Sequence, residues 1–106
     1  MGWHTEVNTM FRLGKNDPTK DQLSVGKVFT TTKSNIRIYP VDLAILLLSE
    51  DWTVLGYCTV RRSEMKGSAM TLDIEILSLF SGEESKIFTA KMKEALTITK
   101  EFPPPP

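Results

Sequence analysis

Cys58 and His4 are the residues that could form a nucleophile and its general base, since each is the only residue of its type in the chain. A catalytic cysteine needs the imidazole within hydrogen-bonding distance and a third group that orients the ring. Cys58 lies instead in an alternating apolar run, where cysteine behaves as a small hydrophobic residue. One cysteine and one histidine also cannot complete a zinc site. We therefore predict that Cys58 packs in the core, that the protein is not an enzyme, and that it uses no metal or cofactor.

Asp73 and Glu75 are a second candidate for chemistry, because residues two apart on a strand project from the same face. Two carboxylates on one face could act as acid and base in glycoside hydrolysis. The alternative is a solvated strand face on which Arg61 is a cross-strand partner of these carboxylates. We favour the second interpretation.

A third group combines cations with an aromatic ring and consists of Arg37, Tyr39, Arg61 and Arg62. Such residues can hold phosphates and stack on bases, so they are the predicted contacts of an RNA-binding module. The chain has 13 basic and 13 acidic residues, and a net charge of zero argues against general attraction to nucleic acid. RNA binding is therefore an alternative to the preferred function.

A further alternative is a small enzyme or metabolite-binding protein with its site at the mouth of a barrel. The residues that would line this mouth are Tyr39, Asp42, Asp51 and Trp52. No glycine-rich loop of the kind that cradles phosphates supports a more specific ligand, because the six glycines are single and scattered.

The C-terminal sequence EFPPPP, residues 101–106, predicts a stiff polyproline-type tail. An acidic residue, a phenylalanine and several prolines resemble the ligand motif that EVH1 domains grip in an aromatic groove. Docking of the tail on another subunit or on its own domain is the other interpretation. In either case Phe102 is the predicted anchor, with Pro103 and Pro104 beside it. The preferred function is therefore a non-enzymatic protein-interaction module or accessory subunit that binds another protein.

The 106 residues indicate a single β-rich domain at 1–100, followed by the proline-rich tail at 101–106. Alternation of apolar and polar residues and clusters of β-branched residues predict strands, which are separated by Gly, Pro, Asn and Asp turns. The predicted strands span 6–13, 25–32, 36–39, 41–48, 52–62 and 70–80. A short buried helix is the alternative for 41–48.

The last two long strands are expected to pair as a hairpin, with the apolar faces of both directed to the core. One register that achieves this places Cys58 opposite Ile74 and Thr59 opposite Asp73, and slips by two residues satisfy the same requirement. In the second strand, the inward residues are predicted to be Met70, Leu72, Ile74 and Ile76.

A helix is predicted at 83–96, because Ser81 and Glu84 have the spacing of a capping box. Apolar residues follow at helical spacing, namely Phe88, Met92, Ala95 and Leu96. The alternative is a hairpin that turns at Gly82 and continues as a strand at 86–92. A last short strand is expected at 97–99.

These elements together predict a mainly β fold, either a β-barrel or a strongly twisted antiparallel sheet of five to seven strands, with one C-terminal helix covering an open side. The N-terminus lacks the basic start and apolar block of a signal peptide, and the longest apolar run is too short to cross a bilayer. We therefore expect no membrane insertion. A single cysteine fits a reducing compartment, so we expect a cytoplasmic protein.

Several short motifs resemble a family of small uncharacterised bacterial proteins. They are Met1-Gly2 with Glu6 and Asn8-Thr9-Met10, then Arg37, Tyr39-Pro40 and Asp42, and finally Asp51-Trp52 and Gly56. The resemblance implies a bacterial cytosolic β-domain and carries over no activity or catalytic residue. A looser likeness to PUA-like and ASCH-type barrels, on Val25-Gly26-Lys27 and the strand with Gly56, implies an RNA-related role.

Overall fold

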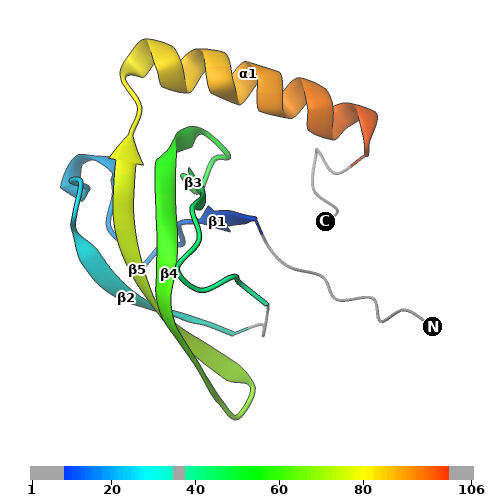
Figure 1. The fold of residues 1–106 in the computed structure, drawn as a ribbon. Coiled ribbons are helices and arrows are strands. Elements are labelled where there is room, and N and C mark those ends of the chain that lie inside the picture. Colours follow the sequence, from blue (N-terminus) through cyan, green and yellow to red (C-terminus); the bar gives the residue numbers. More distant parts are fainter. Residues whose placement is uncertain (1–8, 35–37, 101–106) are drawn as a thin grey trace.

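The computed structural model describes residues 9–34 and 38–100, which form a five-stranded sheet and one long helix (Figure 1). The strand order is β1-β3-β4-β5-β2. The elements are β1 (Met10–Arg12), the 3₁₀ turn η1 (Lys20–Gln22), β2 (Val28–Lys33), β3 (Ile45–Leu48), β4 (Val54–Lys66), β5 (Ala69–Leu79) and α1 (Gly82–Ile98). A mainly β fold with one C-terminal helix is therefore confirmed.

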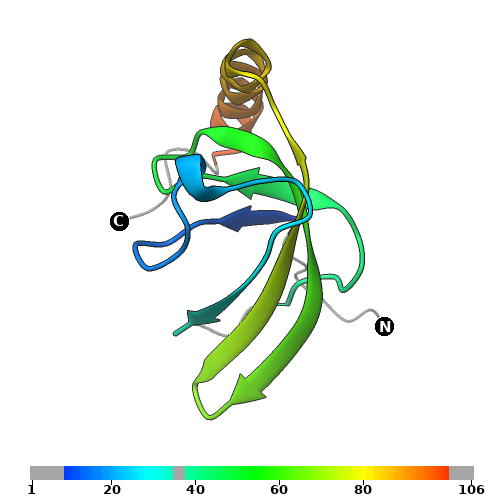
Figure 2. The ribbon, with the colours of Figure 1, turned by 90° about the vertical axis from the view of Figure 1, so that its left-hand side faces the viewer.

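The sheet is mixed, because β1 pairs with β3 in parallel while the other pairs are antiparallel. It curls so that its two edge strands approach each other around the core (Figure 2). The rings of Phe11 on β1 and Phe29 on β2 lie 6.4 Å apart, and Lys33 Nζ donates to the carbonyl of Arg12 over 3.0 Å. Side chains thus bridge the seam between β1 and β2.

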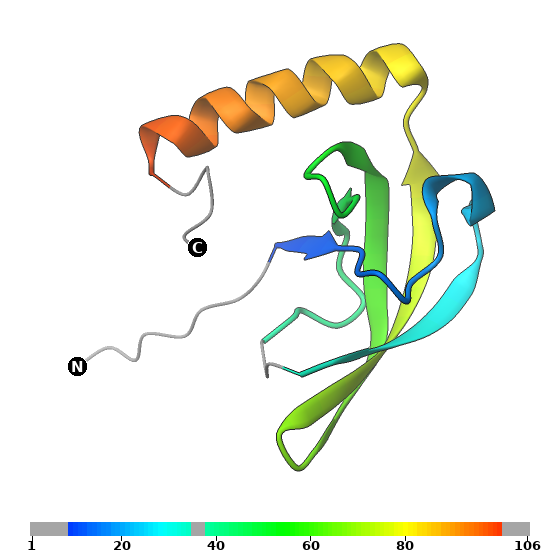
Figure 3. The same cartoon turned by 180° about the vertical axis from the view of Figure 1, so that it is seen from behind.

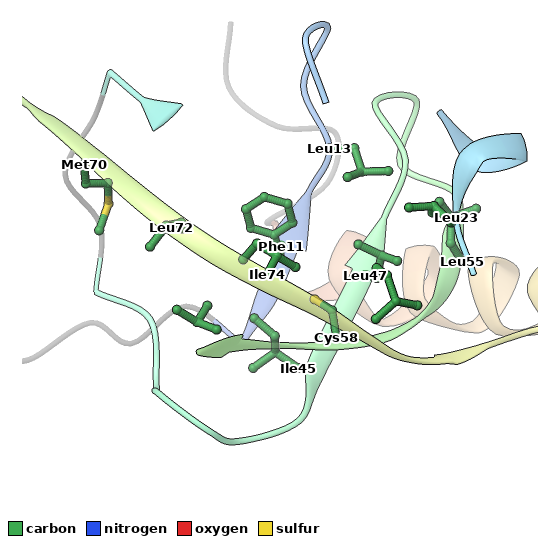
Figure 4. Packing of buried hydrophobic residues seen from close by; sticks show 12 residues of the cluster. Phe11, Leu13, Leu23, Ile45, Leu47, Leu55, Cys58, Met70, Leu72 and Ile74 are labelled. Atoms are coloured by element: carbon green, nitrogen blue, oxygen red, sulfur yellow. The ribbon is translucent and has the colours of Figure 1, made fainter. Parts of the chain in front are cut away.

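The main core lies inside this curl, and its buried side chains come from β1, β3, β4, β5 and the loop residues Leu13 and Leu23 (Figure 4). From β2, half-buried Phe29 packs against it. Met70, Leu72, Ile74 and Ile76 of β5 are all buried and confirm the inward face predicted from alternation. Cys58 is fully buried in the same cluster, as predicted.

The β4–β5 hairpin pairs in a register two residues away from the one proposed. Cys58 lies opposite Ile76 and Thr59 opposite Glu75, whereas Ile74 and Asp73 were expected. The register also shifts between Val60 and Arg62, so that Arg61 is an extra residue in a β-bulge. A slip of two residues keeps every side chain on its face, which is why the core is still the predicted one.

The even-numbered buried residues of β4 divide between two clusters. Val54 packs with Leu48 and Met92 beneath α1, while Cys58 and Val60 belong to the main core. A second register shift, between Tyr57 and Cys58, accompanies this division.

Helix α1 begins with the predicted capping box. Ser81 Oγ accepts from the backbone N–H of Glu84 over 3.2 Å, and Glu84 Oε1 accepts from the N–H of Ser81 over 2.9 Å. The helix continues to Ile98, so the predicted strand at 97–99 and the alternative hairpin are wrong. Ala95, assigned to the buried face, is exposed.

Two helix side chains fix α1 to the sheet at one residue of β4. The hydroxyl of Ser85 donates to the carbonyl of Val54, and Thr89 Oγ1 accepts from the N–H of Val54 over 2.8 Å. Ser85 and Thr89 are one helical turn apart and therefore share a face. Phe88, Met92 and Leu96 complete this face and cover the outer side of β3 and β4.

Other predicted strands are shorter in the structure or lie elsewhere. Of 36–39, residues 38 and 39 are not in a strand and the other two lie outside the described residues. Of 41–48, only Ile45–Leu48 is a strand, because Asp42 has φ 63° and interrupts the extended backbone. Among described residues, 6–13 is reduced to Met10–Arg12, and 25–32 starts only at Val28.

Candidate functional site

The end of the curled sheet away from α1 carries a protruding hairpin (Figure 3). We call residues 61–68, the end of β4 and the turn, the hairpin arm; all of them are exposed. Gly67 in the turn has φ 64°, a conformation that glycine adopts without strain. The arm is held away from α1 by the length of the β4–β5 pairing, which continues to Lys66 and Ala69.

Segment 38–44 lies against the base of the arm. Val41 forms a bridge with Val60, and the N–H of Asp42 donates to the carbonyl of Val60 over 2.8 Å. Apolar side chains that are 48% to 65% exposed project from this segment and from the arm. We call them the apolar rim, and they are Ile38, Val41, Leu43 and Met65.

Arg61 at the bulge links the segment to the sheet. Its Nη1 lies 2.8 Å from Asp42 Oδ1, and its Nε lies 3.0 Å from Glu75 Oε1. Hydrogen bonds to Asp42 and then to Glu75 raise the pKa of the Arg61 guanidinium above its ordinary value. Arg61 therefore remains charged and is paired with two carboxylates.

Arg62 is paired in the same way, with Nε 3.3 Å from Asp73 and Nη2 3.4 Å from Glu64. Asp73 also accepts from the hydroxyl of Thr30 over 2.8 Å. The expected cross-strand pairing with Arg61 is therefore found for Glu75, whereas Asp73 pairs with Arg62 instead.

The predicted RNA contacts do not form one positive patch among the described residues. Arg61 and Arg62 are neutralised by carboxylates, and the Tyr39 ring is half-buried against Phe11, with centroids 6.0 Å apart. Arg37 lies outside the described residues, as do Phe102, Pro103 and Pro104 of the tail.

The four residues assigned to a barrel-mouth site lie in different places. Tyr39 packs on the core and Asp42 pairs with Arg61. Trp52 packs with the cluster under α1, and the guanidinium of Arg12 lies 5.1 Å from its ring centroid. Asp51 lies in the turn between β3 and β4. The structure therefore does not bring this predicted site together.

A cavity of about 440 Å³ opens beside Asp51, between loop 13–20 and turn 49–53. Buried Leu13 and Leu55 are among its lining, and its charged lining residues are Lys15, Asp17, Lys20, Glu50 and Asp51. Hydrogen bonds from the side chains of Ser49 and Thr53 lower the pKa of Asp51. The cavity thus offers charges of both signs above an apolar base.

Cys58 lies in the core and lines neither the cavity beside Asp51 nor the apolar rim. Burial raises the pKa of Cys58 to about 12, so the nucleophilic thiolate is not formed at neutral pH. Among the described residues, no group of three or more His, Cys, Asp or Glu side chains could hold a metal ion. No helix in the described part of the chain has the length and apolar character needed to cross a membrane.

Comparison with known proteins adds a structural likeness. No model of a known protein family and no curated sequence matches the chain. The crystal structure of protein ytmB from Bacillus subtilis is similar, with a TM-score of 0.53 and 21% identity. The match covers 77% of this chain and 98% of the ytmB chain. At this identity the likeness concerns the fold alone.

Sequence reasoning missed the apolar rim. Val41 and Leu43 were assigned to the predicted strand 41–48, and Met65 lies between the predicted strands 52–62 and 70–80. The signal that could have revealed it is Asp42, which follows Pro40-Val41 and stands between two apolar residues. Aspartate tolerates the left-handed backbone conformation, which interrupts a strand, and Asp42 adopts it.

Proposed function

We propose that the protein is a non-enzymatic interaction module that binds another protein through the apolar rim and the hairpin arm. The observation that carries the proposal is the exposure of Ile38, Val41 and Leu43 in the segment beside β4 and of Met65 on the hairpin arm. Large apolar side chains grouped on a surface are typical of protein interfaces. We place this module in the cytoplasm, because its single cysteine is a buried free thiol and needs no oxidising compartment.

The energetics support this choice. Full burial of an exposed side chain of this kind is worth about 1.5–3 kcal/mol, and the rim side chains are 48% to 65% exposed, so each can contribute about half of that to binding. The arginines beside them are already paired with Asp42, Glu75, Glu64 and Asp73, which leaves them suited to a polar border around an apolar centre.

RNA binding has less support, because phosphate contacts require cations whose charge is available. Binding of a small metabolite is favoured by one observation, the cavity beside Asp51. Its volume lies within the range of about 300–1,000 Å³ that is usual for ligand pockets. A thermal-shift screen against charged metabolites tests it, since ligands that bind the native state raise Tm. A ligand whose shift disappears in Asp51→Asn would favour this second function.

Site-specific photo-crosslinking in the native cell tests the proposed function. A photoreactive amino acid replaces Leu43 or Met65, and the matched control carries it at Val25, which is 64% exposed and outside the rim. We expect one discrete adduct with a different protein from positions 43 and 65 and none from position 25. Equal labelling from all three positions, or adducts whose mass is that of two copies of this chain, would contradict the proposal.

Two rim substitutions separate binding from folding. Leu43→Ser and Met65→Ser remove apolar surface that is already exposed, so we expect the free energy of unfolding to change by less than about 0.5 kcal/mol. The adduct formed from the other rim position should be lost.

The tail is tested separately by ending the chain at Lys100. Loss of the adduct in this truncated chain would assign Phe102, Pro103 and Pro104 to the same interface. Retention of the adduct would restrict the interface to the rim and the arm.

A further inference from the structure

The outward face of α1 is exposed, and its residues are arranged symmetrically along the helix. Its inward face packs on the sheet through Ser85, Phe88, Thr89, Met92 and Leu96. The opposite side of the helix, at the top of Figure 1, faces away from the strands. Exposed residues occupy it, namely Ile87, Ala90, Lys91, Glu94, Ala95 and Ile98.

Two of these residues are large and apolar. Ile87 is 64% exposed and Ile98 is 78% exposed. With about 3.6 residues per turn, positions 87 and 98 lie about three turns apart on the same line along the helix. Lys91 and Glu94 lie between them on this line, and Ala90 and Ala95 flank it.

This face is complementary to itself when two copies run antiparallel. The outward residues are arranged symmetrically about the point between Met92 and Lys93. A two-fold axis at that point places Ile87 opposite Ile98 of a second copy, and Lys91 opposite Glu94 of that copy. Ala90 and Ala95 lie on the two edges of this line, and small residues there allow two helices to approach closely. A parallel arrangement in register would place Lys91 opposite Lys91, so the charges select the antiparallel one.

We propose that the protein forms a homodimer in which the outward faces of two α1 helices pack antiparallel about a two-fold axis. Such an interface is isologous, so every contact occurs twice. Within one chain, Lys91 Nζ lies 3.5 Å from Glu94 Oε2, and both side chains are mostly exposed. An exposed pair of this kind contributes little, so the two residues can change to partners in the other copy.

The expected dimer is of modest stability. A 17-residue helix is about 25 Å long, so one helix pair forms an interface at the small end of the range for specific complexes. Dimerisation should therefore depend on protein concentration in the micromolar range. It uses the opposite end of the molecule from the apolar rim and does not rest on the proposed function.

Charge reversal tests the register. Lys91→Glu and Glu94→Lys each replace two attractive contacts by two repulsive ones, so each should raise the dimer Kd by about tenfold in sedimentation velocity experiments. In an equimolar mixture of the two variants, one chain carries carboxylates at positions 91 and 94 and the other carries ammonium groups at both. Each contact between positions 91 and 94 of different chains is then attractive, and association should return to the wild-type level. Mixing cannot restore a contact within one chain, so recovery identifies a contact between copies.

Cysteine crosslinking tests the direction. In the antiparallel dimer, Ile87→Cys and Ile98→Cys meet across the interface, so a mixture of the two single variants should crosslink under oxidation. Neither variant alone should do so, because identical positions are then about 16 Å apart along the axis, too far for a disulfide. Native Cys58 is buried and does not compete. Circular dichroism confirms that each variant retains its helix.

Three results would overturn the proposal. The first is a protein that stays monomeric at all concentrations. The second is a mixture of the two charge variants that associates no more strongly than either variant by itself. The third is a disulfide crosslink that forms in the Ile87→Cys variant without the Ile98→Cys variant. None of these results affects the adducts expected from positions 43 and 65, so the failure of this proposal is distinguishable from the failure of the proposed function.

Discussion

Next to α1, Phe88 and Met92 cover Leu48 and Val54, whereas Leu43 in segment 38–44 and Met65 on the hairpin arm remain exposed. The polar groups differ as well. At the α1 end, Ser85 and Thr89 satisfy the buried backbone of Val54. At the other end, Arg61 and Arg62 make ion pairs on the surface.

The contrast indicates where stability and where recognition reside. A buried backbone group without a partner costs free energy, so the hydrogen bonds at Val54 are needed for folding. Exposed ion pairs contribute little to stability, but they fix side chains in place and reduce net charge around the rim. We therefore expect substitutions at the α1 end to unfold the protein and those at the rim to leave it folded.

The largest effect is expected from two glycines, one in each region. Gly56 lies on β4 near α1, and a Cβ there would be 2.0 Å from the carbonyl oxygen of Ser78. Because backbone rather than a flexible side chain is in the way, Gly56→Ala should destabilise the fold by about 3 kcal/mol or more. At Gly67 in the arm a Cβ meets nothing within 4 Å, and φ is 64°. Gly67→Ala should cost about 1 kcal/mol.

Chemical denaturation measures both changes. Equal losses for the two variants would show that the arm is as constrained as the strand beneath α1, and would contradict the comparison.

The next effect concerns the hydrogen bonds at Val54. Thr89→Val keeps the shape of the side chain but leaves the buried N–H of Val54 without its acceptor, which should cost about 1–3 kcal/mol. Thr30→Val is the matched control, because it removes an exposed hydrogen bond to Asp73. Its cost should stay below about 0.5 kcal/mol. Amide hydrogen exchange at Val54 should accelerate in Thr89→Val but not in Thr30→Val. Unchanged exchange in Thr89→Val would show that Thr89 does not help to hold α1 on the sheet.

The parts of the fold that could be predicted are those that local pattern specifies. In β5, Met70 to Ile76 alternate without interruption, and the capping residues Ser81 and Glu84 lie beside the helix that they begin. Their physical cause lies within a few residues of each position, so the sequence is enough to locate them.

What could not be predicted depends on residues distant in sequence. The register of β4 and β5 differs from the proposed one by two residues, and alternation cannot distinguish even slips. The bulge at Arg61 and the close approach of Gly56 to Ser78 accompany the observed register, and neither has a local signature. The parallel pairing of β1 with β3 is also non-local.

The candidate site was less predictable than the fold, for the same reason. Asp42 and Arg62 were identified only as ligand contacts, while Arg61 was also expected to pair with Asp73 and Glu75. Only the register shows that Asp42 and Glu75 share Arg61 and that Asp73 takes Arg62. Whether a cation is available for a ligand depends on such pairing, which the composition of the chain does not determine.

The smallest expected effect is the pH dependence of the α1 terminus. Hydrogen bonds with the backbone and side chain of Ser81 lower the pKa of Glu84 below its usual value. A carboxylate whose pKa is lowered in the folded state contributes stability above its unfolded pKa and loses it as the pH falls. The first turn of α1 should therefore fray as the pH drops below about 4.5.

Glu84→Gln isolates this effect, because glutamine also completes a capping box but does not titrate. Amide exchange of the first turn, measured between about pH 3 and pH 6 and corrected for intrinsic rates, should show loss of protection at low pH in the wild type and a flat profile in the variant. Identical profiles in the wild type and in Glu84→Gln would mean that other carboxylates control the acid response, and the capping box would then not be the pH-sensitive element of the α1 end.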